Sequence, residues 1–400
     1  IPKIISNLEN SYLYIQGPPG TGKTYQAANA IIELLKQNKK IAVTGLSHKV
    51  IHNLLQRIED MAIEKQFEFE GYKRGTLEDE DTVFNGEYIK TYEKDPVFMD
   101  ALKELNVGQI YAGTKYHLAS TFYDEKIDYL FIDEAGQVSL ADLISIGNVA
   151  KNIILIGDQN QLGQPIKGTH PNESGQSILD YLLEGKDTIP EDRGIFLNKT
   201  YRLNSKLNNF ISSNFYEERL ICDERTDKRL IKFNKKSKIQ DTGIHYIEMN
   251  HTNNVQTSIE EFEVIKDLMK EMIGLEFGDQ GKKRKLTVND FLIISPYNTQ
   301  VNLLISKLEE SKIESPRVGT IDKFQGQEAP ITIISMTSSD SDSLPRNKEF
   351  FFSRNRLNVA ISRAQVASII LFNPNLLDSS PKNLDHIKLM NNFFKILDFS

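Results

Sequence analysis

The chain has 400 residues, enough for two or three domains that each bury a core of their own. Hydrophobic residues make up 39 % and charged residues 26 %, and no apolar run is long enough to span a membrane. The net charge of −7 excludes a uniformly basic nucleic-acid-binding protein, although a local groove can still hold a strand. The single cysteine, Cys222, excludes an internal disulfide framework and a cysteine-based zinc cluster, and favours a cytoplasmic location.

The first predicted strand, Tyr12 to Ile15, leads directly into a glycine-rich turn, Gly-Pro-Pro-Gly-Thr-Gly-Lys-Thr, over residues 17–24. Glycines let such a turn curl until successive N–H groups point into one concavity, which binds phosphate oxygens. We expect Lys23 to place its ammonium against β- and γ-phosphates, and the Thr24 hydroxyl to ligate Mg²⁺. A helix predicted over 25–36 directs its N-terminal dipole at the same anion. The pattern predicts a nucleoside triphosphate site, and its strand–turn–helix context disfavours the alternative of a turn that binds nothing.

Residues 40–44 predict a second strand, followed by a polar turn and a helix over 49–60. Ser47 and His48 lie in that turn, where α/β sheets carry binding loops, although an ordinary helix cap explains them equally well. Residues 61–105 break the alternation of strands and helices, and we expect a short insertion subdomain there.

Two later strands end in groups that suit a nucleotide. The apolar run 127–132 stops at Asp133 and Glu134, which we expect to hold Mg²⁺ and to polarise the attacking water. The alternative is that these carboxylates cap the next helix. The strand at 152–157 ends near Gln161. Buried strands that finish in polar loops predict a doubly wound parallel α/β sheet with its site along one edge.

The first domain is expected over residues 1–190 and the second over 191–400. The second half repeats the α/β rhythm without another phosphate-binding turn. The basic run 282–285 predicts a solvated turn rather than a contact with nucleic acid.

Six strings occur in one order along the chain: Gly-Pro-Pro-Gly-Thr-Gly-Lys-Thr, Asp-Glu-Ala-Gly-Gln, Gly-Asp-x-x-Gln-Leu, Tyr-Arg, Thr-Ile-Asp-x-Phe-Gln-Gly-Gln-Glu and Asn-Val-Ala-x-Ser-Arg-Ala. That order resembles the motifs of superfamily 1 helicases, and most of all the B subclass with the RNA-surveillance helicase and the replication nuclease-helicases. Residues 165–220 also resemble helicase halves of prokaryotic RecB-like nuclease-helicases. The resemblance implies two tandem RecA-like domains with the nucleotide in the cleft between them.

The resemblance also assigns roles. Gln161 would sense the γ-phosphate, Tyr201 would stack on the base, and Glu328 would contact the nucleotide sugar or phosphate. Arg202 and Arg363 would act as arginine fingers from the same chain. The implied catalytic set is Lys23, Asp133, Glu134, Gln161, Arg202 and Arg363, with Thr24 and Asp133 as the metal ligands. The implied nucleotide-binding set is Gly17, Pro18, Pro19, Gly20, Thr21, Gly22, Lys23, Thr24, Tyr25, Gln161, Tyr201, Arg202, Gly326, Glu328 and Arg363. The implied single-strand channel is Ser47, His48, Gly113, Thr114, His117, Ser295, Pro296, Tyr297 and Thr320.

Together these residues imply an ATP-dependent, Mg²⁺-requiring helicase or translocase on single-stranded nucleic acid, with DNA favoured over RNA and 5′→3′ movement. The family's glutamine segment that recognises adenine is not recognisable before Gly17. The sequence therefore leaves open whether the chain selects ATP over other triphosphates. We expect a monomer without a membrane partner, and a nuclease domain fused upstream. One alternative is a nucleotide-controlled switch or scaffold that binds nucleic acid without moving. Another is a ring-forming ATPase, which the two arginines in the same chain disfavour.

Overall fold

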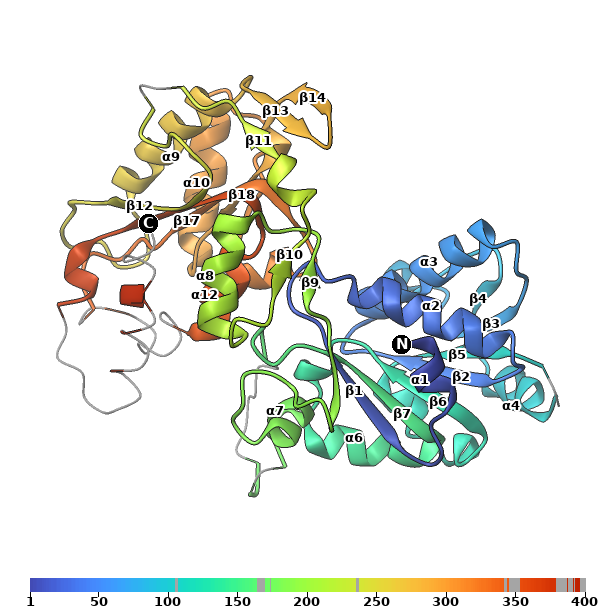
Figure 1. Ribbon diagram of the computed structural model, residues 1–400. Coiled ribbons are helices and arrows are strands. Elements are labelled where there is room, and N and C mark those ends of the chain that lie inside the picture. The colour runs from blue at the N-terminus through green and yellow to red at the C-terminus, as the bar shows by residue number, and fades with distance from the viewer. Residues whose placement is uncertain are drawn as a thin grey trace. The chain divides into compact units, whose positions relative to one another are not determined.

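The computed structural model describes residues 1–104, 107–163, 170–172, 174–234, 237–341, 344, 353–378, 387, 391 and 393–395. The chain forms two compact units, each described here by itself (Figure 1). The first comprises Ile1–Pro18, Gly22–Gln159 and Gly163–Leu197, and the second Pro19–Thr21, Asn160–Leu162 and Asn198–Ser400. Among the described residues, no helix combines the length and the apolar character that crossing a bilayer requires.

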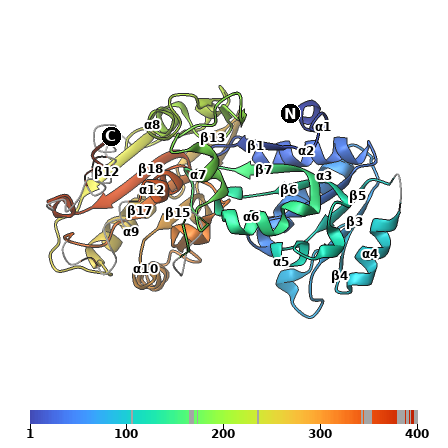
Figure 2. The same cartoon turned by 90° about the horizontal axis from the view of Figure 1, so that it is seen from below.

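The first unit contains a parallel sheet of eight strands in the order β4–β3–β5–β2–β6–β7–β1–β8. These strands are β1 (Tyr12–Gln16), β2 (Lys40–Thr44), β3 (Glu70–Arg74), β4 (Ile89–Tyr92), β5 (Gln109–Ala112), β6 (Ile127–Ile132), β7 (Ala150–Gly157) and β8 (Gly194–Phe196). Its helices are α1 (Pro2–Ser6), α2 (Lys23–Leu35), α3 (His48–Glu64), α4 (Asp95–Lys103), α5 (Lys115–Leu118), α6 (Leu140–Ile146) and α7 (Ile178–Leu183). The helices lie on both faces of the sheet: Figure 1 shows α2 and α3 on one face, and Figure 2, seen from below, shows α6 on the other.

The alternation of side chains along each strand explains this layering. Ile41 and Val43 of β2 point to one face and join the core formed with α2 and α3. Ala42 points to the opposite face and joins the core formed with α6 and α7. Because successive residues of a strand face opposite ways, a strand buried on both faces is apolar throughout and carries a helix layer on each side. The doubly wound arrangement predicted from the sequence is therefore confirmed.

The described part of the segment 61–105, for which the sequence predicts an insertion subdomain, contains the strands β3 and β4. Its strands β3 and β4 extend the main sheet, with β3 pairing in parallel with β5. Tyr72 of β3 stacks on Tyr111 of β5, with ring centroids 5.7 Å apart. Polar and charged residues surround Tyr72 in Glu-Gly-Tyr-Lys-Arg, which hides the apolar signal of a strand. The boundary expected at residue 190 lies before β8, which pairs with β1 of the first unit.

The second unit contains a parallel sheet in the order β12–β18–β17–β15–β16. These strands are β12 (Gly243–Glu248), β15 (Phe291–Ile294), β16 (Val318–Gly319), β17 (Ala329–Ser335) and β18 (Ala364–Phe372). Its helices are α8 (Ser205–Phe215), α9 (Ile259–Met272), α10 (Asn298–Glu310) and α12 (Arg354–Ile361). Helices α9 and α10 pack on one face through Ile265, Met269 and Leu304.

Short strands complete the second unit. A pair is formed by β9 (Lys199–Thr200) and β10 (Ile221–Cys222), and an antiparallel group by β11 (Leu230–Ile231), β13 (Glu276–Asp279) and β14 (Lys282–Lys285). The basic run 282–285 is thus a hairpin strand rather than a turn, and all four of its residues are exposed as predicted.

Candidate nucleotide site and strand-end pocket

The glycine-rich turn has the backbone geometry that the sequence predicts. Gly20 and Gly22 both adopt left-handed conformations, with φ of 73° and 79°, which glycine tolerates without strain. Gly22 is the N-cap of α2, so the first amides of that helix follow directly from the turn. Lys23 folds back across the turn, and its Nζ donates a hydrogen bond of 2.6 Å to the carbonyl oxygen of Gly17. The turn therefore combines an ammonium with a helix N-terminus, which suits an anion.

Three residues of this turn, Pro19–Thr21, belong to the second unit and pack there against the segment 200–202. The Thr200 hydroxyl donates to the Pro19 carbonyl over 2.8 Å, and the Tyr201 amide donates to the Gly20 carbonyl over 2.9 Å. A Cβ on Gly20 would lie 2.4 Å from the Cβ of Arg202. Only glycine fits this approach, so the turn and the Arg202 backbone are held together.

Asp133 and Glu134 lie at the carboxyl end of β6 in the first unit. Asp133 is buried, and its Oδ1 accepts the main-chain N–H of Glu134 over 3.0 Å. Burial and the neighbouring Glu134 carboxylate raise the pKa of Asp133 to about 7, and the Lys23 ammonium partly opposes this rise. Glu134 has a φ of 53°, a left-handed conformation that costs a residue with a side chain ~1–3 kcal/mol. Strain of this kind is concentrated at functional sites.

The donor set fits a magnesium ion carried by a nucleotide. A buried carboxylate whose pKa is raised is stabilised by a nearby cation, and Asp133 and the Thr24 hydroxyl offer the oxygen ligands that Mg²⁺ prefers. Among the described residues, no cluster of three or more His, Cys, Asp or Glu could hold a metal alone. A magnesium ion here would therefore share its ligands with phosphate oxygens, as is usual for nucleotide sites.

The second unit brings Arg202 and Glu328 together as an ion pair. The Nη1 of Arg202 also donates to the Ser362 carbonyl over 3.2 Å. Burial alone would raise the pKa of Glu328, but Arg202 holds this pKa below its ordinary value. Arg363 is buried, and its Nη2 lies 3.5 Å from the Oε1 of Gln161. Four of the predicted nucleotide-binding residues thus form two pairs, Arg202 with Glu328 and Arg363 with Gln161.

Three other predicted residues stand apart from these pairs. The Tyr201 ring is exposed and lies 5.3 Å from the Arg225 guanidinium. Tyr25 on α2 faces Arg57 of α3 at 5.1 Å. Gly326 has a φ of 77° in the turn before β17.

Arg229 is a residue that sequence reasoning missed. Its Nη1 donates to the carbonyl oxygens of Tyr201 and Arg202 over 3.0 and 2.8 Å, and its Nε donates to Asp279 over 3.1 Å. Arg229 therefore fixes the backbone that carries the predicted stacking tyrosine and arginine finger. It lies in a charged stretch without periodicity or motif, so the sequence holds no signal for this role.

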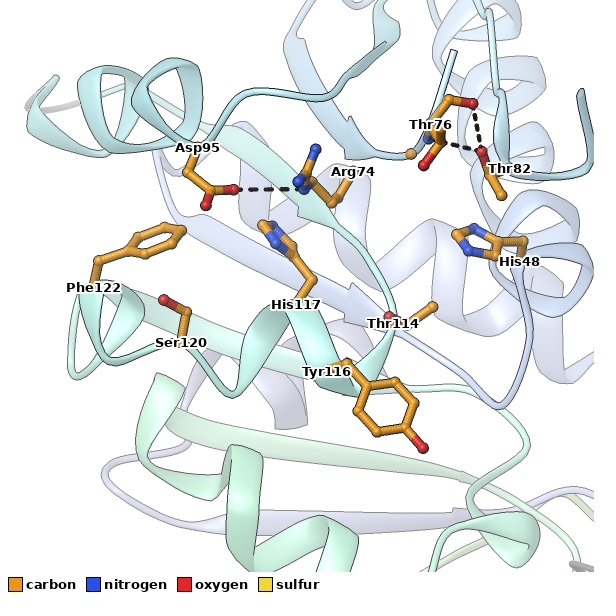
Figure 3. Close-up of a pocket in the computed structure, with 11 residues that line it drawn as sticks. His48, Arg74, Thr76, Thr82, Asp95, Thr114, Tyr116, His117, Ser120 and Phe122 are labelled. Atoms are coloured by element: carbon orange, nitrogen blue, oxygen red, sulfur yellow. Dashed lines mark hydrogen bonds and ion pairs between the residues drawn. The ribbon is translucent and has the colours of Figure 1, made fainter. Parts of the chain in front are cut away.

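Three of the five predicted channel residues of the first unit line part of a cavity of about 390 Å³, which we call the strand-end pocket (Figure 3). His48, Thr114 and His117 lie in its wall, and Gly113 packs against the His117 ring. Ser47 lies just outside the lining and caps α3 by accepting the Val50 amide. Among the described residues, the lining is His48, Arg74, Gly75, Thr76, Thr82, Asp95, Thr114, Tyr116, His117, Ser120 and Phe122.

In the second unit the predicted channel residues lie at the ends of β15 and β16. Ser295 and Pro296 line a small cavity of about 50 Å³. Tyr297 is buried, and its hydroxyl accepts a hydrogen bond of 3.3 Å from Ser338. Thr320 directly follows β16.

Two family models, each described as an AAA domain, match residues 2–166 and 175–375. The chain is 28 % identical over 403 residues to the DNA replication ATP-dependent helicase/nuclease dna2 of Schizosaccharomyces pombe, with 92 % of this chain and 27 % of the relative covered. It is 26 % identical over 408 residues to the DNA polymerase alpha-associated DNA helicase A of the same yeast, with 87 % and 59 % covered. The chain thus spans less than two thirds of the length of either relative.

Among solved structures, the DNA-bound DUF1998 helicase MrfA shares the fold, with a TM-score of 0.52 at 9 % identity, over 99 % of this chain and 50 % of that chain. The family matches, the relatives and the ordered motifs agree with one another. The chain belongs to the AAA domain family that the two models describe, and its relatives and ordered motifs are those of superfamily 1 helicases.

Proposed function

We propose that this chain hydrolyses ATP with Mg²⁺ in order to move along and unwind single-stranded nucleic acid, with DNA favoured over RNA and 5′→3′ movement. The observation that supports the ATPase most directly is the packing of Gly20 against Arg202, because it joins the phosphate-binding turn to an arginine segment. The preference for DNA is supported by the names of the relatives, and the direction by the resemblance of the motifs.

In this proposal each named side chain has one task. Lys23 binds the β- and γ-phosphates, and Glu134 orients and polarises the attacking water. Arg202 and Arg363 stabilise the charge that spreads over the γ-phosphoryl oxygens, a contribution of roughly 10³–10⁵ in rate for arginine fingers. Gln161, beside Arg363, senses whether the γ-phosphate is present. A magnesium ion, held by Thr24 and Asp133, would neutralise phosphate charge.

Movement would follow from the loss of the γ-phosphate. Hydrolysis removes negative charge that the arginines bind, and such a loss releases segments ordered by a triphosphate. The released segments belong to a unit that also carries predicted contacts with the single-stranded nucleic acid. Each hydrolysis would therefore change how that unit binds the nucleic acid. The nuclease domain upstream, the monomeric state and the cytoplasmic location remain predictions. The first is supported by the combined helicase/nuclease name of one relative.

The test is the ATPase rate with and without a single strand. We expect oligo(dT) to raise the rate at least about tenfold, with oligo(U) as the RNA comparison. Lys23→Ala and Glu134→Gln should abolish turnover. Lys39→Ala is the control for the first, because Lys39 lies in the loop after α2, away from the phosphate-binding turn. A rate indifferent to every strand would contradict translocation and favour the nucleotide-controlled switch.

A further inference from the structure

The strand-end pocket lies where a parallel α/β sheet binds ligands. Its lining comes from the loops that follow β2, β3, β4 and β5, four neighbouring strands of the first unit. Ligands of open α/β sheets bind outside the carboxyl ends of the strands. The phosphate-binding turn follows β1 and Asp133 follows β6, so the same edge of the sheet carries two separate places for a ligand.

The charges of this pocket do not suit a phosphate group. Of its described lining residues, Arg74 and Asp95 are charged at neutral pH, and they face each other with Nε and Oδ1 3.5 Å apart. Burial lowers the pKa of His117 to about 4 and also lowers the pKa of His48, so both imidazoles are neutral. A phosphate site needs a surplus of positive charge, whereas the charges of the described lining residues sum to zero, and the Lys73 ammonium behind the wall is already bonded to His48 and to two carbonyl oxygens.

The rings and the size of the pocket suit a flat, uncharged group. Figure 3 shows Arg74, Asp95, His117 and Phe122 gathered at one end of the cavity, with His48, Thr76 and Thr82 at the other. The Phe122 and His117 rings lie 6.1 Å apart. Aromatic and imidazole rings are the surfaces on which proteins stack the bases of single strands. A volume of about 390 Å³ lies within the range of small-ligand pockets.

The wall is held in place from behind by Lys73, a fully buried lysine of β3. Its Nζ lies 2.9 Å from the Nδ1 of His48 and donates to the carbonyl oxygens of Arg74 and Thr82. One ammonium thus connects three parts of the lining. On the other side, the Tyr123 hydroxyl lies 2.5 Å from the Nε2 of His117 and fixes that ring. The pocket is therefore a preorganised site.

We propose that the strand-end pocket binds one base of the single strand and that the Arg74–Asp95 pair selects guanine. This inference rests on the proposed function, because it assumes that the single-stranded nucleic acid crosses the edge of the sheet formed by the carboxyl ends of its β-strands. Guanine presents an acceptor, O6, beside two donors, N1–H and N2–H. Arg74 would donate to O6, and the two oxygens of Asp95 would accept from N1–H and N2–H. Adenine, cytosine and thymine lack two adjacent donors. Arg74 and Asp95 lie outside all six motifs, so the preference would belong to this chain rather than to the motifs.

The test measures the affinity of the whole chain for fluorescently labelled DNA dodecamers at equilibrium. The strands are oligo(dT) and dodecamers that repeat two dT and one dG, dA, dC or dI, called dT/dG, dT/dA, dT/dC and dT/dI; none of them is self-complementary, and inosine lacks only the N2 amino group of guanine. We expect the dT/dG strand to bind about tenfold more tightly than dT/dA, which is within the range for one bidentate base contact. The dT/dI strand should lose most of this advantage. The inosine comparison uses the unmodified chain, so it does not depend on the folding of a variant.

Two variants locate the preference. Asp95→Ala should bring the dT/dG and dT/dA affinities within twofold of each other. Asp100→Ala is the matched control, because Asp100 is an exposed residue of the same helix α4 that pairs with Lys103. Asp100→Ala should keep the preference.

Equal affinity for all strands, with stimulation of the ATPase intact, would overturn the base pocket while leaving the proposed function in place. A guanine preference that survives Asp95→Ala would also overturn it. Failure to bind any strand would overturn the proposed function as well.

Discussion

Each unit has a buried carboxylate near the end of a strand, Asp133 in the first and Glu261 in the second, and the two have opposite surroundings. Asp133 follows β6 in the first unit and accepts an N–H from its own neighbour, Glu134. Glu261 on α9 lies under the end of β17 in the second unit, where it accepts the Thr337 amide over 2.9 Å and the Ser335 hydroxyl. Its Oε1 also lies 3.5 Å from the Nε2 of His251. Burial raises the pKa of both carboxyl groups.

The difference shows that burial of a carboxylate does not by itself mark a site. Protein groups from distant parts of the second unit satisfy Glu261, so its role is to hold the end of the sheet together. Asp133 is stabilised mainly by Lys23, which the phosphate-binding turn supplies. We therefore propose that Asp133 serves a ligand and that Glu261 serves the structure of the second unit.

The largest expected effect is that of Asp133→Asn. Removing the charge should lower the ATPase rate by roughly 10²–10³ or more, since the amide cannot replace a carboxylate beside a metal ion. Thermal stability without nucleotide should be unchanged or higher, because a buried charge is removed. Steady-state ATPase assays and thermal unfolding of the free protein measure both effects. Large destabilisation without nucleotide would show that Asp133 is structural.

Glu261→Ala should show the opposite pattern. It leaves the Thr337 amide and the Ser335 hydroxyl buried without an acceptor, at a cost of about 2–4 kcal/mol in the stability of the second unit. The KM for ATP should remain within about twofold, because Glu261 is assigned no role at the nucleotide. Denaturant unfolding and ATPase kinetics provide the two measurements. Glu260→Ala is the control, since Glu260 is the preceding residue of α9 and lies near the surface. A raised KM for ATP in Glu261→Ala, at wild-type stability, would contradict the structural role of Glu261.

The smallest expected effect concerns Thr337, whose amide Glu261 accepts. Thr337 has a φ of 72°, a conformation that is strained for a β-branched residue and natural for glycine. The Thr337 side chain is also buried, and its hydroxyl bonds to Ser295 and to the Ser335 carbonyl. Relief of the strain should therefore offset only part of the loss of that side chain, and Thr337→Gly should cost less than Thr332→Gly. Thr332→Gly in β17 should cost about 2 kcal/mol, because Thr332 is buried in a regular strand and its hydroxyl donates to Ser368. Equal losses in the two variants would show that the Thr337 backbone carries no such strain.

The parts that could be predicted from the sequence are those encoded by neighbouring residues. The turn around Lys23 and the pair Asp133–Glu134 follow directly from strands, so their place at the edge of a sheet could be inferred. Strand β3 could not, because Lys73 interrupts its pattern and is buried by partners elsewhere in the fold, such as His48. The two hydrogen bonds of Glu261 join residues that are separated by 74 and by 76 positions in the sequence, and no local pattern encodes them.

The central proposal is that Arg363 acts as an arginine finger in ATP hydrolysis. Its most direct test is Arg363→Ala, with ATP affinity and strand-stimulated turnover measured on the same preparation. We expect an ATP affinity within a few-fold of wild type and a fall in turnover of roughly 10³-fold or more. Turnover at the wild-type rate, or a loss of ATP binding with no separate effect on turnover, would contradict it.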